Sequence, residues 1–190
     1  MGDIVVSEFV TLDGVMEAPG GEDHPDGKGG WTMRFFDEEA GAFKGEELSA
    51  GAALLLGRVT YEHFAAAWPS MTDDYGFADR MNGLPKLVAS TTLREPLEWN
   101  ATLLAGDLTD AVRAAKAQFD GDILVFGSAE LVGSLAELGL VDEYRLMVFP
   151  VVLGSGKRLF PDGIDVTDLK LVDTKTTSTG VAILTYRPQT

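Results

Sequence analysis

Residues 52–62 of the chain read Ala52-Ala53-Leu54-Leu55-Leu56-Gly57-Arg58-Val59-Thr60-Tyr61-Glu62. The apolar run stops at Gly57, turns through Arg58 and continues into residues that favour a helix. This order predicts a buried strand over 52–56 and a helix from Thr60 to Trp68, with Thr60 as the N-cap. An anion fits such a turn, because unpaired backbone N–H groups and the cation of Arg58 point the same way. The stretch therefore predicts an α/β domain organised around a bound nucleotide.

The composition narrows the class of protein. A chain of 190 residues has the length of one domain, so we predict a single domain over 1–190. It contains no cysteine, which excludes disulfides, thiolate metal sites and cysteine nucleophiles. A formal charge of −15 argues against nucleic-acid and anionic-membrane partners, since both demand clustered Lys and Arg. With no basic leader segment and no apolar run of ~18 residues, we expect a cytoplasmic protein.

Three segments precede the opening stretch. Residues 4–10 are rich in β-branched and apolar side chains and predict a strand that ends at an Asp13-Gly14 turn. Residues 18–30 are almost entirely Gly, Pro and charged residues, too polar to order themselves by apolar burial. We predict that 18–30 is a mobile loop closing over a site, with a plain surface insertion as the alternative. Residues 31–49 carry apolar side chains at helical spacing and predict an amphipathic helix.

The remainder of the chain alternates strand and helix patterns and ends in a hairpin. Strands are predicted at 86–90, 102–105, 122–127 and 143–149, helices at 107–119 and 128–138, and hairpin strands at 169–177 and 181–187. Asp107 and Ser128 are placed to cap the two helices, and the polar connection 71–84 has room for a short helix. This order predicts an α/β fold with a central mixed, mainly parallel sheet, an antiparallel C-terminal hairpin and helices on both faces.

Several short motifs in the sequence are incomplete and do not support the sites that they resemble. Residues 154–159 resemble fragments of two phosphate-binding motifs but complete neither, because Val151, Arg158 and Leu159 stand where each motif needs another residue. The two histidines, His24 and His63, have no zinc-type spacing, so we expect no metal site. The chain has no Gly-x-Ser-x-Gly elbow and hence no obvious serine nucleophile.

Three segments in fixed order, 57–62, 90–93 and 126–131, together resemble the dihydrofolate reductase superfamily. Segments 7–14 and 150–160 make the chain more similar to small stand-alone relatives of the reductase (C-terminal) domain of riboflavin-biosynthesis bifunctional deaminase-reductases. The resemblance covers essentially the whole chain. It implies the three-layer dihydrofolate reductase-like fold, with NADPH bound across the C-terminal ends of the strands.

The resemblance also implies which residues hold the cofactor. Its candidates are Gly57, Arg58, Val59 and Thr60 at the adenosine-half phosphates, Ser90, Thr91 and Arg94 near the adenine ribose phosphate, and Gly127, Ser128 and Ala129 at the pyrophosphate. Each segment alone is equally typical of a plain turn or helix cap. Only the ordered combination favours a cofactor site.

The implied function is an NADPH-dependent reductase of the 5-amino-6-(5-phosphoribosylamino)uracil reductase type, which transfers hydride to a small ring or carbonyl substrate. Asp13, Trp31 and Phe35 flank the 18–30 loop and are the candidate substrate contacts, although aromatic residues at helical spacing also pack into cores. No catalytic residue is assigned. The edge strand of the C-terminal hairpin favours a homodimer.

Two alternatives remain open at this point. One is a dihydrofolate reductase proper, whose pterin-binding acid has three candidates here in Asp37, Glu38 and Glu39. The other is a non-catalytic nucleotide-binding or interaction module, since a fold does not by itself establish an activity.

Overall fold

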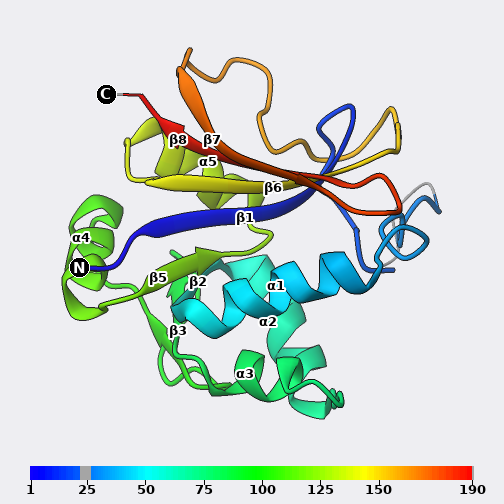
Figure 1. The fold of residues 1–190 in the computed structure, drawn as a ribbon. Helices are drawn as coiled ribbons and strands as arrows, with labels where there is room; N and C mark the ends of the chain where they lie inside the picture. Colours follow the sequence, from blue (N-terminus) through cyan, green and yellow to red (C-terminus); the bar gives the residue numbers. More distant parts are fainter. Residues whose placement is uncertain (22–26, 190) are drawn as a thin grey trace.

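The computed structural model describes residues 1–21 and 27–189 (Figure 1). Residues 22–26 belong to the predicted loop 18–30, so the central part of that prediction lies outside the described residues. The described flanks of the loop are bonded to each other and to the segment after β6. The Gly30 N–H donates to the Ala18 carbonyl at 2.9 Å, and the Lys28 ammonium donates to the Leu153 carbonyl at 3.0 Å.

The fold is built on an eight-stranded sheet in the order β4-β3-β2-β5-β1-β6-β8-β7. The strands are β1 Ile4–Thr11, β2 Gly51–Gly57, β3 Lys86–Ala89, β4 Ala101–Leu103, β5 Asp122–Val125, β6 Glu143–Phe149, β7 Leu169–Thr176 and β8 Ala182–Pro188. All pairings from β4 to β6 are parallel, and β8 runs antiparallel to both β6 and β7. The predicted mixed, mainly parallel sheet with an antiparallel C-terminal hairpin is confirmed.

Helices cover both faces of this sheet. They are α1 Glu38–Ala50, α2 Arg58–Ala67, α3 Phe77–Gly83, α4 Leu108–Gln118 and α5 Ala129–Glu137, with a short 3₁₀ helix, η1, at Trp68–Ser70. One core cluster joins the sheet to α4 and α5, and another joins it to α1, α2 and α3. The result is three layers, with the hairpin β7–β8 and helix α3 at opposite ends of the molecule in Figure 1.

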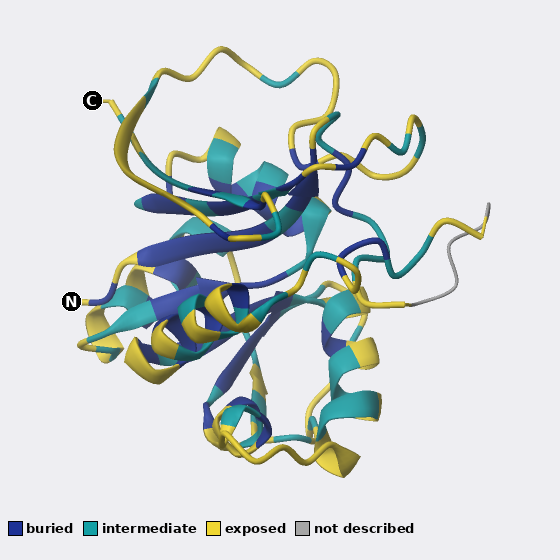
Figure 2. Cartoon of the chain, turned by 45° about the vertical axis from the view of Figure 1, so that its right-hand side comes forward, coloured by how far each residue is buried: buried dark blue, intermediate teal, exposed yellow. Residues whose placement is uncertain are grey.

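The central strands are apolar on both faces because both faces are covered. Successive side chains of a strand point to opposite faces, so Val5 and Leu54 join the cluster beneath α1 to α3, whereas Val6 and Leu55 join the cluster beneath α4 and α5. All four are fully buried. These strands form the dark blue centre of Figure 2, while the helices turn exposed yellow surfaces outward. The uninterrupted apolar run of the opening stretch reflects this burial on both sides.

Helix starts differ from the sequence-based predictions in two places. The helix predicted over 31–49 begins only at Glu38, because the Asp37 carboxylate accepts from the Ala40 N–H and caps it. The helix predicted to start at Thr60 begins at Arg58 with Gly57 in the N-cap position. Thr60 is free for another contact as a result, and its hydroxyl accepts from the Ser128 N–H at 2.9 Å.

The other predicted caps have mixed outcomes. The Asp107 carboxylate accepts from the Thr109 and Asp110 N–H groups, so the predicted cap of α4 is confirmed. Ser128 does occupy the N-cap position of α5, but its side chain makes no capping hydrogen bond. None of the helices in the described part of the chain is long and apolar enough to cross a lipid bilayer.

Candidate nucleotide-binding cleft

The sheet opens between β1 and β5. These strands pair only from Ile4 to Val6 and from Ile123 to Val125, after which β5 ends while β1 continues along β6 to Thr11. After β1 the chain crosses to β2, on the β5 side of β1. After β5 it crosses to β6, on the opposite side. This is the switch point at which open α/β sheets bind ligands, beyond the carboxyl ends of the strands.

A cleft of about 2310 Å³ occupies this position. Its walls come from the turns after β2, β3 and β5, from the second half of β1 and from one face of α1. Pockets for a single drug-sized ligand measure roughly 300–1,000 Å³. The cleft therefore has room for a dinucleotide and a second molecule together.

The first and third predicted cofactor segments are hydrogen-bonded to each other on the wall of the cleft. The Gly57 N–H donates to the Ser128 hydroxyl at 2.9 Å, and the Ser128 N–H donates to the Thr60 hydroxyl at 2.9 Å. Helices α2 and α5 consequently begin side by side. Their first turns, which include Val59 and Ala129, line the cleft and carry the N–H groups that favour an anion.

Gly127 is required by the backbone at this junction. Its φ of +58° lies in the left-handed region, where a side chain is strained. A Cβ placed there would also lie 3.0 Å from the Thr60 hydroxyl oxygen. The turn after β5 can pack this closely against Thr60 only because position 127 has no side chain.

The middle segment also reaches the cleft, with one exception. Ser90 and Thr91 line the wall, and the Ser90 hydroxyl accepts from the Leu93 N–H at 3.0 Å, which fixes the turn after β3. Arg94 does not line the cleft, because its guanidinium donates to the Thr91 and Leu93 carbonyls. Arg58 does line it and is held by Glu62, with 2.8 Å between the Nη1 and Oε2 atoms.

The three predicted substrate residues do not line the cleft, and the structure gives each another role. The Asp13 carboxylate accepts from the Leu153 and Gly154 N–H groups, and a hydrogen bond from the Thr11 hydroxyl is the main cause that lowers its pKa to about 2. Asp13 therefore ties the turn after β1 to the segment after β6.

The two aromatic candidates, Trp31 and Phe35, pack in a hydrophobic core cluster. Trp31 is 4% exposed and packs edge-on against Phe149, and its indole N–H donates to the Glu17 carbonyl at 2.8 Å. Phe35 is partly buried against the same core, with the Arg34 guanidinium 4.9 Å from its ring centroid. Being next to the 18–30 loop in sequence does not bring these side chains into the cleft.

Glu8 is a functional candidate that the sequence reasoning missed. It lines the cleft, is 5% exposed, and accepts from the Gly127 N–H through Oε2 at 3.0 Å. Its Oε1 atom has no hydrogen-bond partner among the described residues. Burial raises the Glu8 pKa well above its usual value, against the opposing effects of Lys44 and the Gly127 N–H. The signal in the sequence was a single charged residue within a buried strand.

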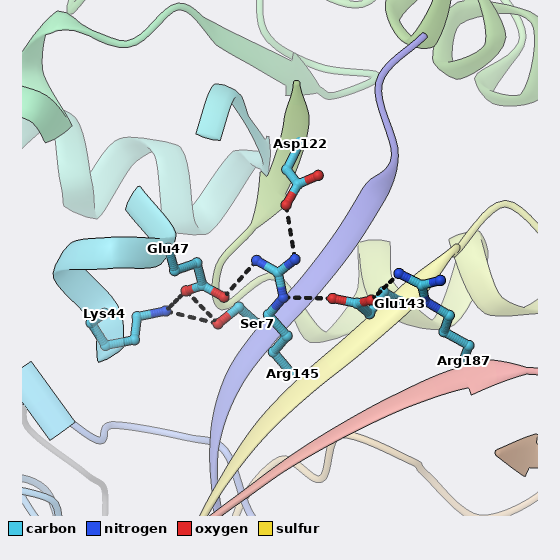
Figure 3. Close-up of polar contacts among 7 residues, drawn as sticks. All are labelled: Ser7, Lys44, Glu47, Asp122, Glu143, Arg145 and Arg187. Atoms are coloured by element: carbon cyan, nitrogen blue, oxygen red, sulfur yellow. Dashed lines mark hydrogen bonds and ion pairs between the residues drawn. The ribbon is translucent and has the colours of Figure 1, made fainter. Parts of the chain in front are cut away.

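Lys44 and Glu47 are the second missed feature (Figure 3). Both are buried on α1, where the Lys44 ammonium donates to the Glu47 carboxylate and, at 2.8 Å, to the Ser7 hydroxyl. The same ammonium lies 4.0 Å from the centroid of the Phe126 ring, in the wall of the cleft. The signal in the sequence was a pair of charges on the face of the helix that carries Ala40 and Leu48.

The network continues across the strands on the face of the sheet that α1 covers. The Arg145 guanidinium lies 3.5 Å from Glu47, 2.8 Å from Asp122 and 2.6 Å from Glu143. Glu143 also pairs with Arg187 at 2.9 Å. Figure 3 shows these groups running from α1 past β1 to β5, β6 and β8. The charges of Lys44 and Glu47 beside the cleft are thereby connected to further ion pairs across the same face of the sheet.

The sheet order, the three layers and the cleft at the switch point define a protein of the dihydrofolate reductase-like fold class. The chain belongs to the RibD C-terminal domain family, whose sequence profile matches residues 3–183. It is 31% identical over 186 residues to the uncharacterized protein YyaP of Bacillus subtilis (strain 168), covering 96% of this chain and 93% of that protein.

Solved structures share the fold at low sequence identity. A pyrimidine reductase-like protein from Corynebacterium diphtheriae superposes with a TM-score of 0.68 and 13% identity over 100% of this chain and 92% of that one. A diaminohydroxyphosphoribosylaminopyrimidine deaminase/5-amino-6-(5-phosphoribosylamino)uracil reductase from Thermotoga maritima gives 0.67 and 15%, over 99% of this chain and 57% of that one. Dihydrofolate reductase from Enterococcus faecalis, complexed with NADP(H), gives 0.60 and 15%, over 100% and 98%.

Proposed function

We propose that this protein is an NADPH-dependent reductase that transfers hydride to a small ring or carbonyl substrate. The observation that carries the proposal is the hydrogen-bonded junction of Gly57, Thr60 and Ser128, which brings two helix N-termini to one wall of a large cleft. Family membership and the NADP(H) complex of the Enterococcus faecalis enzyme support a nicotinamide cofactor.

The residues of the cleft fit a dinucleotide. Gly127 lets the turn after β5 pack closely against Thr60, and the first turns of α2 and α5 supply N–H donors. Ser90 and Thr91 supply hydroxyl groups, and Arg58 supplies a positive charge. These interactions are local, so a chain of net charge −15 can still hold an anion there.

When bound, the cofactor supplies the hydride. The chain positions it and keeps water from the reacting carbon. Phe9 and Phe126 form apolar wall beside Glu8 and Lys44, at the end of the cleft where β1 and α1 meet. A substrate bound against this wall would lie next to a cofactor that extends from the Gly127 turn.

The proposal favours a riboflavin-type rather than a folate substrate. The Asp37 carboxylate accepts hydrogen bonds from the Ser178 and Thr179 hydroxyls and from the Ala40 N–H. The pKa of Asp37 is lowered to about 2, and the bond from the Ala40 N–H is the largest cause. The Glu39 carboxylate accepts from the Ser178 N–H. Two of the three acids considered for a pterin are thus engaged with the turn between β7 and β8.

The test is a fluorescence titration with NADPH, followed by turnover with 5-amino-6-(5-phosphoribosylamino)uracil, dihydrofolate and a panel of small aldehydes. We expect NADPH binding, and loss of reduced-nicotinamide absorbance with the first compound or with an aldehyde. Binding without oxidation of any compound would favour the non-catalytic module. No binding at all would remove both cofactor proposals.

We also propose that the protein forms a homodimer through its C-terminal hairpin. Strand β7 is the edge of the sheet, and its Leu171 and Val172 side chains are 46% and 44% exposed. Exposed apolar side chains on a free edge favour association. Sedimentation equilibrium of the wild type and of a Val172→Lys variant tests this proposal. We expect a dimeric wild type and a weaker dimer in the variant, and a monomeric wild type would contradict the proposal.

A further inference from the structure

Reduction of a C=O or C=N bond by hydride requires a proton as well. The carbon receives the hydride, and the neighbouring oxygen or nitrogen must then be protonated. A positioned side chain that supplies this proton accelerates such a step by roughly 10²–10⁴-fold. Of the described titratable side chains that line the cleft, Glu8 and Lys44 are the ones that are buried. Glu8 and Lys44 are therefore the two candidates for the proton donor.

Lys44 is committed to other partners. Its ammonium donates to the Ser7 hydroxyl and the Glu47 carboxylate, and it lies over the Phe126 ring. Loss of its proton would leave the Glu47 charge without its nearest partner inside the protein, which is costly. Lys44 is thus suited to hold a charge in place rather than to release a proton.

Glu8 has the opposite arrangement. One carboxyl oxygen, Oε2, is fixed by the Gly127 N–H at 3.0 Å, while Oε1 has no partner among the described residues. A buried polar atom without a partner is costly unless a ligand or water completes its hydrogen bonds. The carboxyl group sits at the opening between β1 and β5, next to the turn proposed for the pyrophosphate.

We propose that Glu8 is the proton donor of the reduction, acting through Oε1. This inference rests on the proposed function. Glu8 gives its proton to the substrate oxygen or nitrogen that gains the electron pair of the double bond as the adjacent carbon accepts hydride from the reduced nicotinamide. The O–H bond of Glu8 breaks and a new O–H or N–H bond forms on the product. The two electrons would come from the reduced nicotinamide, which would be oxidised in turn, and a proton from solvent would then restore the acid form of Glu8.

The surroundings of Glu8 suit both of its charge states. Burial is the largest influence on its pKa and raises it, and Glu47 on α1 raises it further, which stabilises the acid form relative to that of an exposed glutamate. Lys44 on α1 and the Gly127 N–H after β5 act in the opposite direction. They stabilise the carboxylate that remains after the proton has left.

The test compares Glu8→Gln with the wild type, with Glu137→Gln as the matched control. Glutamine has nearly the shape of glutamate and can still accept from the Gly127 N–H, but it has no acidic proton to give. Glu137 is exposed at the end of α5 and does not line the cleft, so its variant makes the same chemical change away from the site.

We expect Glu8→Gln to bind NADPH as the wild type does and to slow single-turnover NADPH oxidation by ~100-fold or more. Glu137→Gln should match the wild type in both measurements, and Glu8→Asp, which keeps an acid, should recover part of the rate. Equal oxidation rates in Glu8→Gln and the wild type would overturn the inference. Thermal melts of each variant establish that it is folded.

A second measurement does not depend on turnover. Infrared difference spectra of the wild type minus Glu8→Gln, recorded across pH in the NADP⁺ complex, report whether Glu8 is a carboxylic acid. We expect the acid band at neutral pH, and a carboxylate band alone would overturn the inference. A wild type that neither binds nor oxidises NADPH would instead overturn the proposed function, and the same spectra of the free protein would still report the state of Glu8.

Discussion

Lys44 and Glu47 form an ion pair inside the protein, with 6% and 4% of their surfaces exposed. They lie one turn apart on α1, between the sheet and the cleft, and each has a further partner in Ser7 or Arg145. An ion pair this far from water depends on both of its members, because either one alone would be an uncompensated buried charge.

Single substitutions in this pair are expected to destabilise the fold. Lys44→Met or Glu47→Gln should each lower the free energy of unfolding by about 3–5 kcal/mol, because each leaves a buried charge behind. The double variant should lose less than the sum of the two. Urea unfolding of all four proteins measures this coupling. Additive losses would mean that the two side chains do not depend on each other.

Glu8 should make the stability of the protein fall with rising pH. Its pKa is raised in the folded state, so its contribution is complete below the usual pKa of 4.5 and is lost as the pH rises through the folded-state pKa. Each unit of upward shift corresponds to about 1.4 kcal/mol. The Tm of Glu8→Gln minus that of the wild type should therefore grow from pH 5 to pH 9. A constant difference would contradict this expectation.

Arg58 offers a test of the proposed phosphate contact. Arg58→Ala should weaken NADPH binding by ~10-fold or more, in line with ~1.5–3 kcal/mol for a charged hydrogen bond. Glu62→Ala removes the partner that holds the guanidinium and leaves the charge in the cleft wall, so its affinity should equal or exceed that of the wild type. Fluorescence titrations measure both. Unchanged affinity in Arg58→Ala would exclude the contact.

Gly127 and Gly133 form a matched pair of glycines. Gly127→Ala forces a side chain into a left-handed conformation and against Thr60, so we expect a loss of about 1–2 kcal/mol in stability together with weaker NADPH binding. Gly133 lies inside α5 with open space around it, and Gly133→Ala should stabilise the protein by about 0.5–1 kcal/mol. Similar behaviour of the two variants would argue against a special role for Gly127.

Asp13 should matter at acid pH. Its pKa is lowered to about 2, mainly by the Thr11 hydroxyl, so its contribution to stability is present above the usual pKa of 3.8 and is lost as the pH falls toward 2. Asp13→Asn should lower the Tm at pH 7 and flatten its decline below pH 4. An unchanged acid limb in that variant would show that the bonds to Leu153 and Gly154 contribute little.

The sequence predicts the fold well because its strongest signals are local. Each of three short segments determines a local piece of structure: the apolar run 52–56, the capping residue Asp107 and the hairpin turn at 178–180. Their order along the chain then determines how strands and helices alternate. The positions of Trp31 and Phe35 depend on where helix α1 begins, which is only after its N-cap Asp37, and both rings pack against the core.

Glu8 could not be predicted for a different reason. Its partner, the Gly127 N–H, lies 119 residues away, and only the tertiary structure shows that the strand leaves this carboxyl at the opening of the sheet. In a sequence, a charged residue at a strand position most simply faces solvent. The same holds for Lys44, whose burial depends on Phe126 and Ser7 from two distant strands or turns.

The position of β1 also constrains how the chain acquires its structure. Although β1 is made first, its two neighbours are β5 and β6, which end at Val125 and Phe149. Contacts of such sequence separation slow folding, because a long loop must close before they form. During synthesis β1 therefore stays unpaired until β5 and β6 have also been made and have left the ribosome. The chain thus depends in that interval on protection from aggregation, by its acidic charge or by a chaperone.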